Sequence, residues 1–244
     1  MLAALYAAPF ALLVVRAAAD VWRHPAIVPQ RLGTRGLAQV LSTSGSAWPA
    51  LRNSLLVALA TAALALLLAW PASRVLARGA PRVRVGLLVL IALPLLVPPL
   101  AVGHGLSTWL LRWGLADSLA GLVAAHLVYV LPYVAVLLAA GFTARVTRLE
   151  EAAATLGASR ASRLRHVTVP AVAPALAFAL LLGFLVSWSQ YGTSLAVAGA
   201  TPMLPLLLVP FVQHDPQVAS TLTLLFVAPP LLALTVAARW GRHR

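Results

Sequence analysis

The chain has 244 residues, of which 61% are hydrophobic and 9% charged, and its mean hydropathy is +0.94. A soluble domain carries about 25% charged residues, so this composition excludes an ordinary soluble domain and predicts an all-α, polytopic membrane protein. The apolar runs are continuous. Because the strands of an outer-membrane barrel alternate apolar and polar residues, a barrel is excluded as well.

The formal net charge is +13, and arginine supplies all of the basic residues apart from histidine. In a soluble protein this charge would suggest nucleic acid. Here the arginines cluster at the ends of apolar segments, where they mark cytoplasmic loops, so we expect membrane lipid around the chain and no nucleic-acid partner. The sequence has no cysteine, which excludes disulfides, thiolate metal sites and cysteine nucleophiles.

Six apolar segments are long enough, as helices, to cross a hydrocarbon core of about 30 Å, the first only just. They span roughly residues 1–19, 53–72, 85–109, 119–142, 170–195 and 219–238. No basic residue precedes the apolar run of the first segment, so it predicts a membrane span rather than a cleaved signal peptide. Pro94, Pro98 and Pro99 predict a broken or kinked third span.

The placement of the arginines predicts the orientation of the spans. Twelve of the eighteen arginines fall in the polar segments 73–84, 143–169 and 239–244. The side richer in arginine is expected to be cytoplasmic, which places both termini inside. The segment 20–52 is rich in Gly, Pro, Ser and Arg, and it is predicted to lie along the external membrane surface before Asn53 caps the second span.

The longest polar stretch, residues 149–170, reads LEEAAATLGASRASRLRHVTVP. From Glu151 to Leu156 it is acidic at the start and rich in alanine, which favours a helix. Gly157 suits a helix stop in the left-handed conformation, and Pro170 suits the start of the next span. We expect a short helix, a turn, and a second helix that leads into the membrane.

This stretch resembles the EAA loop of permease subunits of binding-protein-dependent ABC importers. Glu151-Ala152-Ala153 is followed by Gly157 and by a hydrophobic-x-hydrophobic-Pro sequence that ends at Pro170. The resemblance implies that Glu151 contacts a separate ATPase, that the two alanines permit close approach, and that the glycine allows the turn. The alternative is a solvated connection whose arginines only mark the cytoplasmic side.

The resemblance covers about residues 50–240 and implies a type I importer permease fold. It divides the chain into a first helix with an external segment, 1–52, and a core transmembrane domain, 53–240, with the coupling loop at 143–170. It also implies two ATPase subunits inside, a second permease copy or paralogue, and an external substrate-binding protein, all at a bacterial inner membrane.

The sequence favours an external source of energy. It contains no GxxxxGK[ST] motif, so ATP is expected to bind to the partner ATPase, and no cofactor is expected in this chain. A carrier driven by protons or sodium usually buries an acidic residue, whereas Asp20, Asp117 and Asp215 all lie away from the span centres. No carboxylate pair or metal-ligand spacing occurs within a span, so we do not predict an enzyme or a metal site.

Polar residues inside spans mark candidate positions of a translocation pathway. Helical spacing places Ser187, Gln190, Tyr191 and Ser194 on one face of the fifth span, and His104 follows the prolines of the third. The alternative for such residues is hydrogen bonding between helices.

The fourth span carries a second candidate set. His126, Tyr129 and Tyr133 share one face of this span, where they either line a cavity or form a packing face.

Two other functions stay open at this point: a free-standing secondary carrier or channel that needs no ATPase, and a membrane scaffold. The segments 187–191 and 201–206 are similar to permeases for thiamine, ferric iron, polyamines or oxyanions such as sulfate. The sequence does not rank these substrates.

Overall fold

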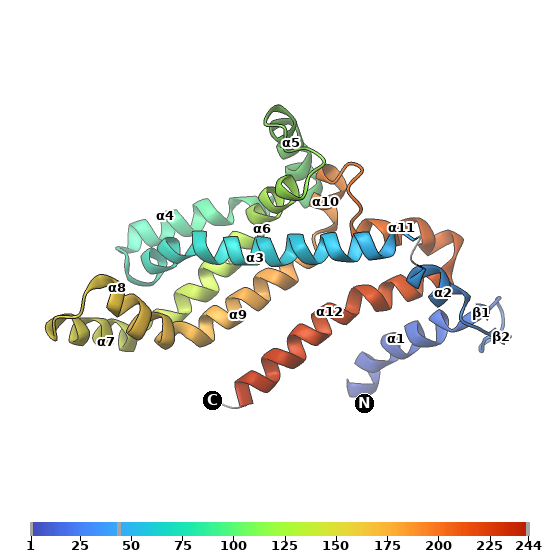
Figure 1. Ribbon diagram of the computed structural model, residues 1–244, viewed down its shortest axis with the longest axis horizontal. Helices are drawn as coiled ribbons and strands as arrows, with labels where there is room; N and C mark the ends of the chain where they lie inside the picture. The colour runs from blue at the N-terminus through green and yellow to red at the C-terminus, as the bar shows by residue number, and fades with distance from the viewer. Residues whose placement is uncertain (1, 43–44, 243–244) are drawn as a thin grey trace. The chain divides into compact units, whose positions relative to one another are not determined.

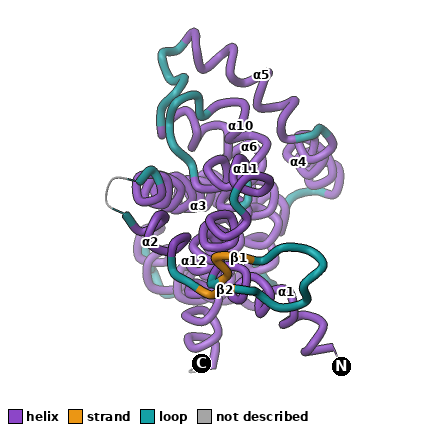
Figure 2. The backbone as a smooth tube through the Cα atoms, turned by 90° about the vertical axis from the view of Figure 1, so that its right-hand side faces the viewer, coloured by secondary structure: helices purple, strands orange, loops and turns teal. Residues whose placement is uncertain are grey.

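The computed structural model describes residues 2–42 and 45–242. Figure 2 shows that helix makes up most of the traced backbone, which confirms the all-α prediction. The chain divides into two compact units. They comprise residues 1–55 with 200–236 (unit 1) and residues 56–199 with 237–244 (unit 2). The boundary predicted at residue 52 separates an external segment from the core transmembrane domain by function rather than by compactness, and it stays a prediction. Arg244 lies outside the described residues.

Unit 1 combines the first elements of the chain with its last helices. They are α1 (Leu2–Ala17), β1 (Ala19–Val21), β2 (Arg31–Leu32), α2 (Arg35–Leu41), the start of α3 (Ala47–Arg78), α11 (Leu204–His214) and most of α12 (Pro216–Arg242). The two strands pair antiparallel with an irregular register, and they form the hairpin drawn in orange in Figure 2.

Two polar contacts hold unit 1 together at the start of α12. The Nε2 of Gln217 donates to Oδ1 of Asp20 at 2.9 Å and to the carbonyl oxygen of Gly33 at 3.3 Å. The guanidinium of Arg35 donates to both carboxylate oxygens of Asp215, at 2.6 and 2.9 Å. The side-chain amide of Gln217 and the bidentate ion pair between Arg35 and Asp215 therefore join segments about 180 positions apart in sequence.

Unit 2 contains the remaining helices. They are the rest of α3, α4 (Pro81–Ala92), the 3-10 turn η1 (Leu93–Leu96), α5 (Pro99–Arg112), α6 (Leu119–Gly141), α7 (Ala144–Thr155), α8 (Arg160–Arg163), the π-helical turn η2 (Leu164–Thr168), α9 (Val169–Trp188) and α10 (Tyr191–Val197). In Figure 1, α6 and α9 lie side by side and α7 follows directly after α6.

Four helices of the described chain are long and apolar enough to cross a membrane. A fifth span is obtained if Pro81–Leu96 and Pro99–Arg112, which meet at a bend of 98°, form one broken span. The bend falls at the predicted prolines, because a proline ring removes a backbone donor and clashes with the preceding turn. All six predicted segments contain helix, but the first is covered by α1, which has only 16 residues.

The core of unit 2 lies where α6 packs along α9. Val130, Val134 and Leu138 repeat every four residues on α6, and all three are fully buried. Gly183 on α9 faces them, and a Cβ atom added there would lie 3.0 Å from Val134 and 3.3 Å from Ala62 of α3. A small residue is needed here because helices in lipid associate through close packing rather than through the hydrophobic effect.

The second span begins earlier than predicted. Since α3 starts at Ala47, Asn53 lies inside the helix, and the prediction that it caps this helix is wrong. Its side chain donates instead to the carbonyl of Pro202 at 3.1 Å. The hydroxyl of the next residue, Ser54, accepts from the backbone N–H of Leu204, the first residue of α11, at 2.9 Å. Both side chains therefore form hydrogen bonds with the backbone at the start of α11.

The fifth span is interrupted where the sequence predicted a continuous face. α9 ends at Trp188, and α10 begins at Tyr191 after a break. The prediction that Ser187 and Ser194 share a face of one helix is therefore wrong, because they lie on two different helices. The helical spacing rule did not account for the turn at Ser189 and Gln190.

Replacing Gly183 by leucine should destabilise unit 2, since the added side chain must displace Val134 and Ala62. We expect a cost of about 1–3 kcal/mol, as for other overpacked cores, and a lower melting temperature of the purified protein in detergent. Gly86→Leu is the matched control, because nothing lies within 4 Å of a Cβ atom at this helical glycine. Equal melting temperatures for the two variants would contradict the packing argument.

Candidate functional site

The helix α7 ends in a fixed turn. The backbone N–H of Gly157 donates to the carbonyl of Ala154, and the N–H of Ala158 donates to the carbonyl of Ala153, both at 3.0 Å. This pair of bonds is a Schellman ending, which requires a left-handed residue, and Gly157 has a φ of +83°. The predicted helix and stop are confirmed, although the helix starts at Ala144.

The three residues of the predicted Glu-Ala-Ala sequence lie on α7. Glu151 and Ala152 are exposed and Ala153 is partly buried. Leu156, which the sequence reasoning did not single out, is 87% exposed beside the turn at Gly157. Burial of this side chain against another protein would remove apolar surface from water.

Glu150 faces α3 and η2 instead and is held by three donors. Nη2 of Arg74 donates to Oε1 at 2.8 Å, and Nη1 of Arg78 donates to Oε2 at 2.7 Å. The hydroxyl of Thr168 also donates to Oε1, at 2.5 Å. The Glu150 side chain is only 15% exposed. One carboxylate therefore joins α7 to the end of α3 and to η2.

Aromatic rings hold the two arginines in place. The guanidinium of Arg74 lies 5.7 Å from the ring centre of Trp70 and 5.5 Å from that of Phe142, and Arg78 lies 5.6 Å from Phe142. The Trp70 and Phe142 rings meet edge to face, with centroids 5.2 Å apart. Guanidinium groups stack well on aromatic faces, so these rings help to orient both arginines toward Glu150.

The contacts of Glu150 also change its acidity. Burial raises the pKa of this carboxyl, but the hydrogen bonds from Thr168 and Arg78, together with the charges of Arg78 and Arg74, outweigh burial and leave the pKa below its ordinary value of 4.5. Glu150 is therefore ionised at neutral pH and acts as the acceptor of all three donors.

The segment after the turn enters the membrane as one winding helix. Ser159 caps α8 by accepting from the N–H of Ser162 at 3.2 Å, and helix then continues through η2 into α9. Pro170, predicted to suit the start of a span, is the second residue of α9, two positions after η2 ends at Thr168. A π-helical turn is a common adjustment next to a residue that lacks an N–H group, and here it also holds Thr168.

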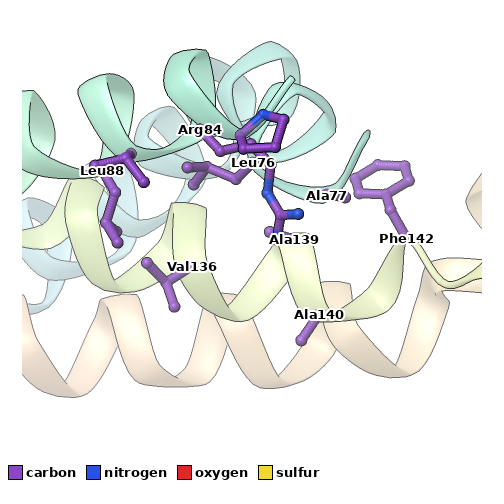
Figure 3. A pocket seen from close by; sticks show the side chains of 10 residues that line it. Leu76, Ala77, Arg84, Leu88, Val136, Ala139, Ala140 and Phe142 are labelled. Atoms are coloured by element: carbon purple, nitrogen blue, oxygen red, sulfur yellow. The ribbon is translucent and has the colours of Figure 1, made fainter. Parts of the chain in front are cut away.

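An apolar recess, shown in Figure 3, is lined in part by Phe142, the ring on which Arg74 and Arg78 stack. It has a volume of about 550 Å³, and its lining includes Leu76, Leu88, Val136 and Phe142. Arg84 is its one charged lining residue. Such a lining suits lipid or packed side chains rather than a polar substrate, so the Glu150 contacts lie at the edge of an apolar region.

Four of the six predicted pathway residues fall into two groups. In the first, Nδ1 of His126 lies 2.9 Å from Oγ of Ser187 and Nε2 lies 3.0 Å from Oγ of Ser194, and all three are buried. Because the Ser194 hydroxyl donates to the carbonyl of Gln190, Nε2 of His126 must be the donor to Ser194, and Nδ1 accepts from Ser187. These residues link α6 to α9 and α10.

The second group surrounds a recess of about 530 Å³. Gln190 lies here with Tyr129, Tyr133 and Ser189, next to the proline break after η1. The hydroxyl of Tyr129 donates to the carbonyl of Val97 at 2.7 Å, which satisfies an acceptor that the broken helix leaves free. The recess therefore gathers polar side chains where two helices are interrupted.

The remaining pathway candidates lie elsewhere. His104 is exposed on α5 and Tyr191 is exposed at the start of α10, and neither belongs to the lining of this recess. The assignment of the six residues to a pathway stays a prediction. Within residues 2–42 and 45–242, no group of three or more His, Asp or Glu residues could hold a metal ion.

Sequence reasoning missed the role of Glu150, although a signal was present. Arg74 and Arg78 are four residues apart, which places both on one face of a helix end. An acidic residue was needed to match this pair. The choice between Glu150 and Glu151 depended on which of them faces α3, and periodicity alone did not give that orientation.

Comparison with known proteins agrees with this architecture. A sequence model of the family described as "binding-protein-dependent transport system inner membrane component" matches residues 69–242. The ABC transporter permease protein ORF1 of Streptomyces antibioticus is 43% identical over 145 residues, which are 57% of this chain, and the chain spans 61% of that protein's length. The molybdenum transport system permease protein ModB of Mycobacterium tuberculosis is 34% identical over 216 residues, covering 82% of each chain.

A solved structure shows the same fold. It is the crystal structure of a bacterial ABC transporter involved in the import of the acidic polysaccharide alginate, with a TM-score of 0.75 over 98% of this chain and 92% of that chain. The sequence identity is 17%, so this likeness speaks for the fold alone.

The Glu150 contacts predict a pH-dependent stability. Because its pKa is lowered in the folded protein, they stabilise above the ordinary value of 4.5, and the stabilisation is lost as pH falls through the lower folded value. Melting temperatures in detergent should therefore differ between the native chain and Glu150→Gln by a constant amount near neutral pH, and the difference should shrink in acid. Glu151→Gln makes the same charge change at an exposed side chain without an ion pair among the described residues; it is the control and should leave the melting temperature near that of the native chain.

Proposed function

Since the chain belongs to the family of binding-protein-dependent transport system inner membrane components, and is thus a permease subunit of an ABC importer, we propose that α7 and the turn at Gly157 couple it to a separate ATPase. Family membership favours this role over that of a free-standing carrier. The observation that carries the proposal is the shape of the loop: a helix end fixed by two backbone bonds presents Glu151 and Leu156 outward.

The exposed side of α7 has the chemistry of a docking surface. Alanine at 152 leaves the helix narrow, so a partner can approach its backbone closely. Leu156 offers an apolar anchor and Glu151 offers a charge. A rigid element loses little conformational entropy on binding, which favours tight docking and lets a push from the partner reach the membrane helices.

The remaining partners follow from the proposed role. ATP would bind to the ATPase subunits, and a second permease copy or a paralogue would complete the pathway. A binding protein would deliver substrate from outside. The arginines near α7 support a cytoplasmic position for this loop and for both termini, since basic residues concentrate on that side of the membrane.

We propose a tetrahedral oxyanion of the molybdate class as substrate. The relative ModB of Mycobacterium tuberculosis is named for molybdenum transport, and oxyanions are among the substrates expected from the sequence. The recess beside the proline break offers neutral donors from Tyr133 and Gln190, and its lining contains no carboxylate that would repel an anion. Neutral donors hold an anion weakly, which suits release into the cell.

The turn supports a mutational test of coupling. Gly157 and Gly114 both have positive φ, +83° and +68°, and a Cβ atom at either meets nothing within 4 Å. Alanine should therefore cost a similar 1–2 kcal/mol, roughly, at each site. Only Gly157→Ala should weaken co-purification of the ATPase and slow transport. Equal effects of both variants on co-purification would argue against the loop as the docking element.

The transport role itself is tested by purifying the tagged chain from its membrane in mild detergent and identifying the proteins that accompany it. We expect an ATPase and a second permease. Reconstituted with its binding protein in liposomes, the complex should take up molybdate only when ATP is supplied. Uptake of sulfate but not molybdate would reject the substrate, and uptake by the chain alone without ATP would reject the importer role.

A further inference from the structure

We propose that Glu150 is the positioning residue through which movement of the coupling helix reaches the membrane spans. This inference rests on the proposed coupling role of α7 and extends it. Glu151 and Leu156 would bind the ATPase, whereas the preceding carboxylate would fasten α7 to α3 and to the helix that leads into α9.

The first support is the direction of the two carboxylates. Consecutive residues of a helix point about 100° apart, so one can face a partner while the other faces the membrane helices. Glu151 is exposed, while the side chain of Glu150 is 15% exposed and ion-paired to Arg74 and Arg78. Two adjacent acids thus have different environments, and only one of them is free to meet another chain.

The second support is the route by which α7 touches the spans. Its backbone packs closely against η2 and α8, and Val146 near its start is buried in the core of unit 2. The ion pairs of α7 within the described residues both run through Glu150 to the last turns of α3. The ionic contact of α7 with α3 therefore depends on a single carboxylate.

The third support is the convergence of separate elements on that carboxylate. Arg74 and Arg78 come from α3, their stacking partner Phe142 ends α6, and Thr168 lies in η2 at the start of the next span. Thr168 is itself buried, and its one hydroxyl proton is directed mainly to Glu150, with the carbonyl oxygen of Arg163 3.3 Å from the hydroxyl. A displacement of Glu150 must therefore move or strain three helices together.

A merely structural ion pair would predict something different. Its loss would lower the stability of the permease and leave the ratio of transport to ATP hydrolysis unchanged in the molecules that fold. A transmitting contact predicts that this ratio falls while docking and hydrolysis persist, because the ATPase still binds α7 but no longer moves α3 and α9 with it.

The experiment compares variants in the whole complex, reconstituted in liposomes with its ATPase and binding protein and with molybdate as the transported probe. For Glu150→Gln we expect normal co-purification of the ATPase, ATP hydrolysis near the native rate, and about tenfold fewer molybdate ions taken up per ATP, within the usual range of coupling between sites. Glu151→Arg should instead lose the ATPase on purification.

A milder pair of variants covers the case in which Glu150→Gln does not fold. Thr168→Val removes only the hydroxyl donor, whereas Thr168→Ser retains it, so uptake per ATP should fall in the first and recover in the second. A double variant, Glu150→Gln with Arg78→Gln, should be no worse than Glu150→Gln alone, because both act through one contact.

The outcomes separate the two proposals. If the native chain does not bring down an ATPase, the coupling role of α7 fails before the Glu150 variants are considered. If the native complex transports and Glu150→Gln or Thr168→Val keeps the native ratio of uptake to hydrolysis, the link through Glu150 is refuted while the importer role stands.

Discussion

Within a bilayer, every backbone polar group must find its partner inside the protein, and the structure follows from this constraint. Continuous helix satisfies it along α3, α6, α9 and α12. Where prolines interrupt the third span, the hydroxyl of Tyr129 supplies the donor that the carbonyl of Val97 would otherwise lack. The second interruption, between α9 and α10, is bridged by the ring of His126, which contacts the hydroxyls of Ser187 on α9 and Ser194 on α10. Polar side chains therefore gather where helices break, and the same places offer a polar surface to a solute.

The same need for backbone hydrogen-bond partners applies at the end of α7. The carbonyls of Ala153 and Ala154 accept from the residues of the turn, so the loop needs no side chain to finish its helix. Its exposed surface is thereby left for a partner, while Glu150 fastens the opposite side to α3. Because the turn at Gly157 is fixed by backbone bonds and α7 is ion-paired to α3, a displacement of this loop can move the membrane helices. A flexible loop would change its own conformation instead.

Charge is distributed unevenly in this chain. There are five acidic residues for eighteen arginines, so most arginines have no carboxylate to pair with. Asp20, Asp215 and Glu150 each take up at least one guanidinium, and the pKa of each is lowered. The largest cause is the hydrogen bond from Gln217 at Asp20 and the hydrogen bond from Arg35 at Asp215, whereas at Glu150 burial raises the pKa and the bonds from Thr168 and Arg78 outweigh it. These three acids fix local geometry in their own units. Glu151 has no ion pair among the described residues and remains exposed.

The sequence by itself determined what depends on composition and on neighbours along the chain. The length of the apolar segments predicted a helical membrane protein. The prolines at 94, 98 and 99 predicted the broken span, and Gly157 predicted the end of a helix. Tertiary structure decided whatever depends on contacts between distant segments. It put Asn53 inside a helix, divided Ser187 from Ser194 by a break, and chose Glu150 over Glu151 for the arginines of α3. Local propensity is set by a residue and its near neighbours, but the partner of a polar side chain is set by which helix packs beside it.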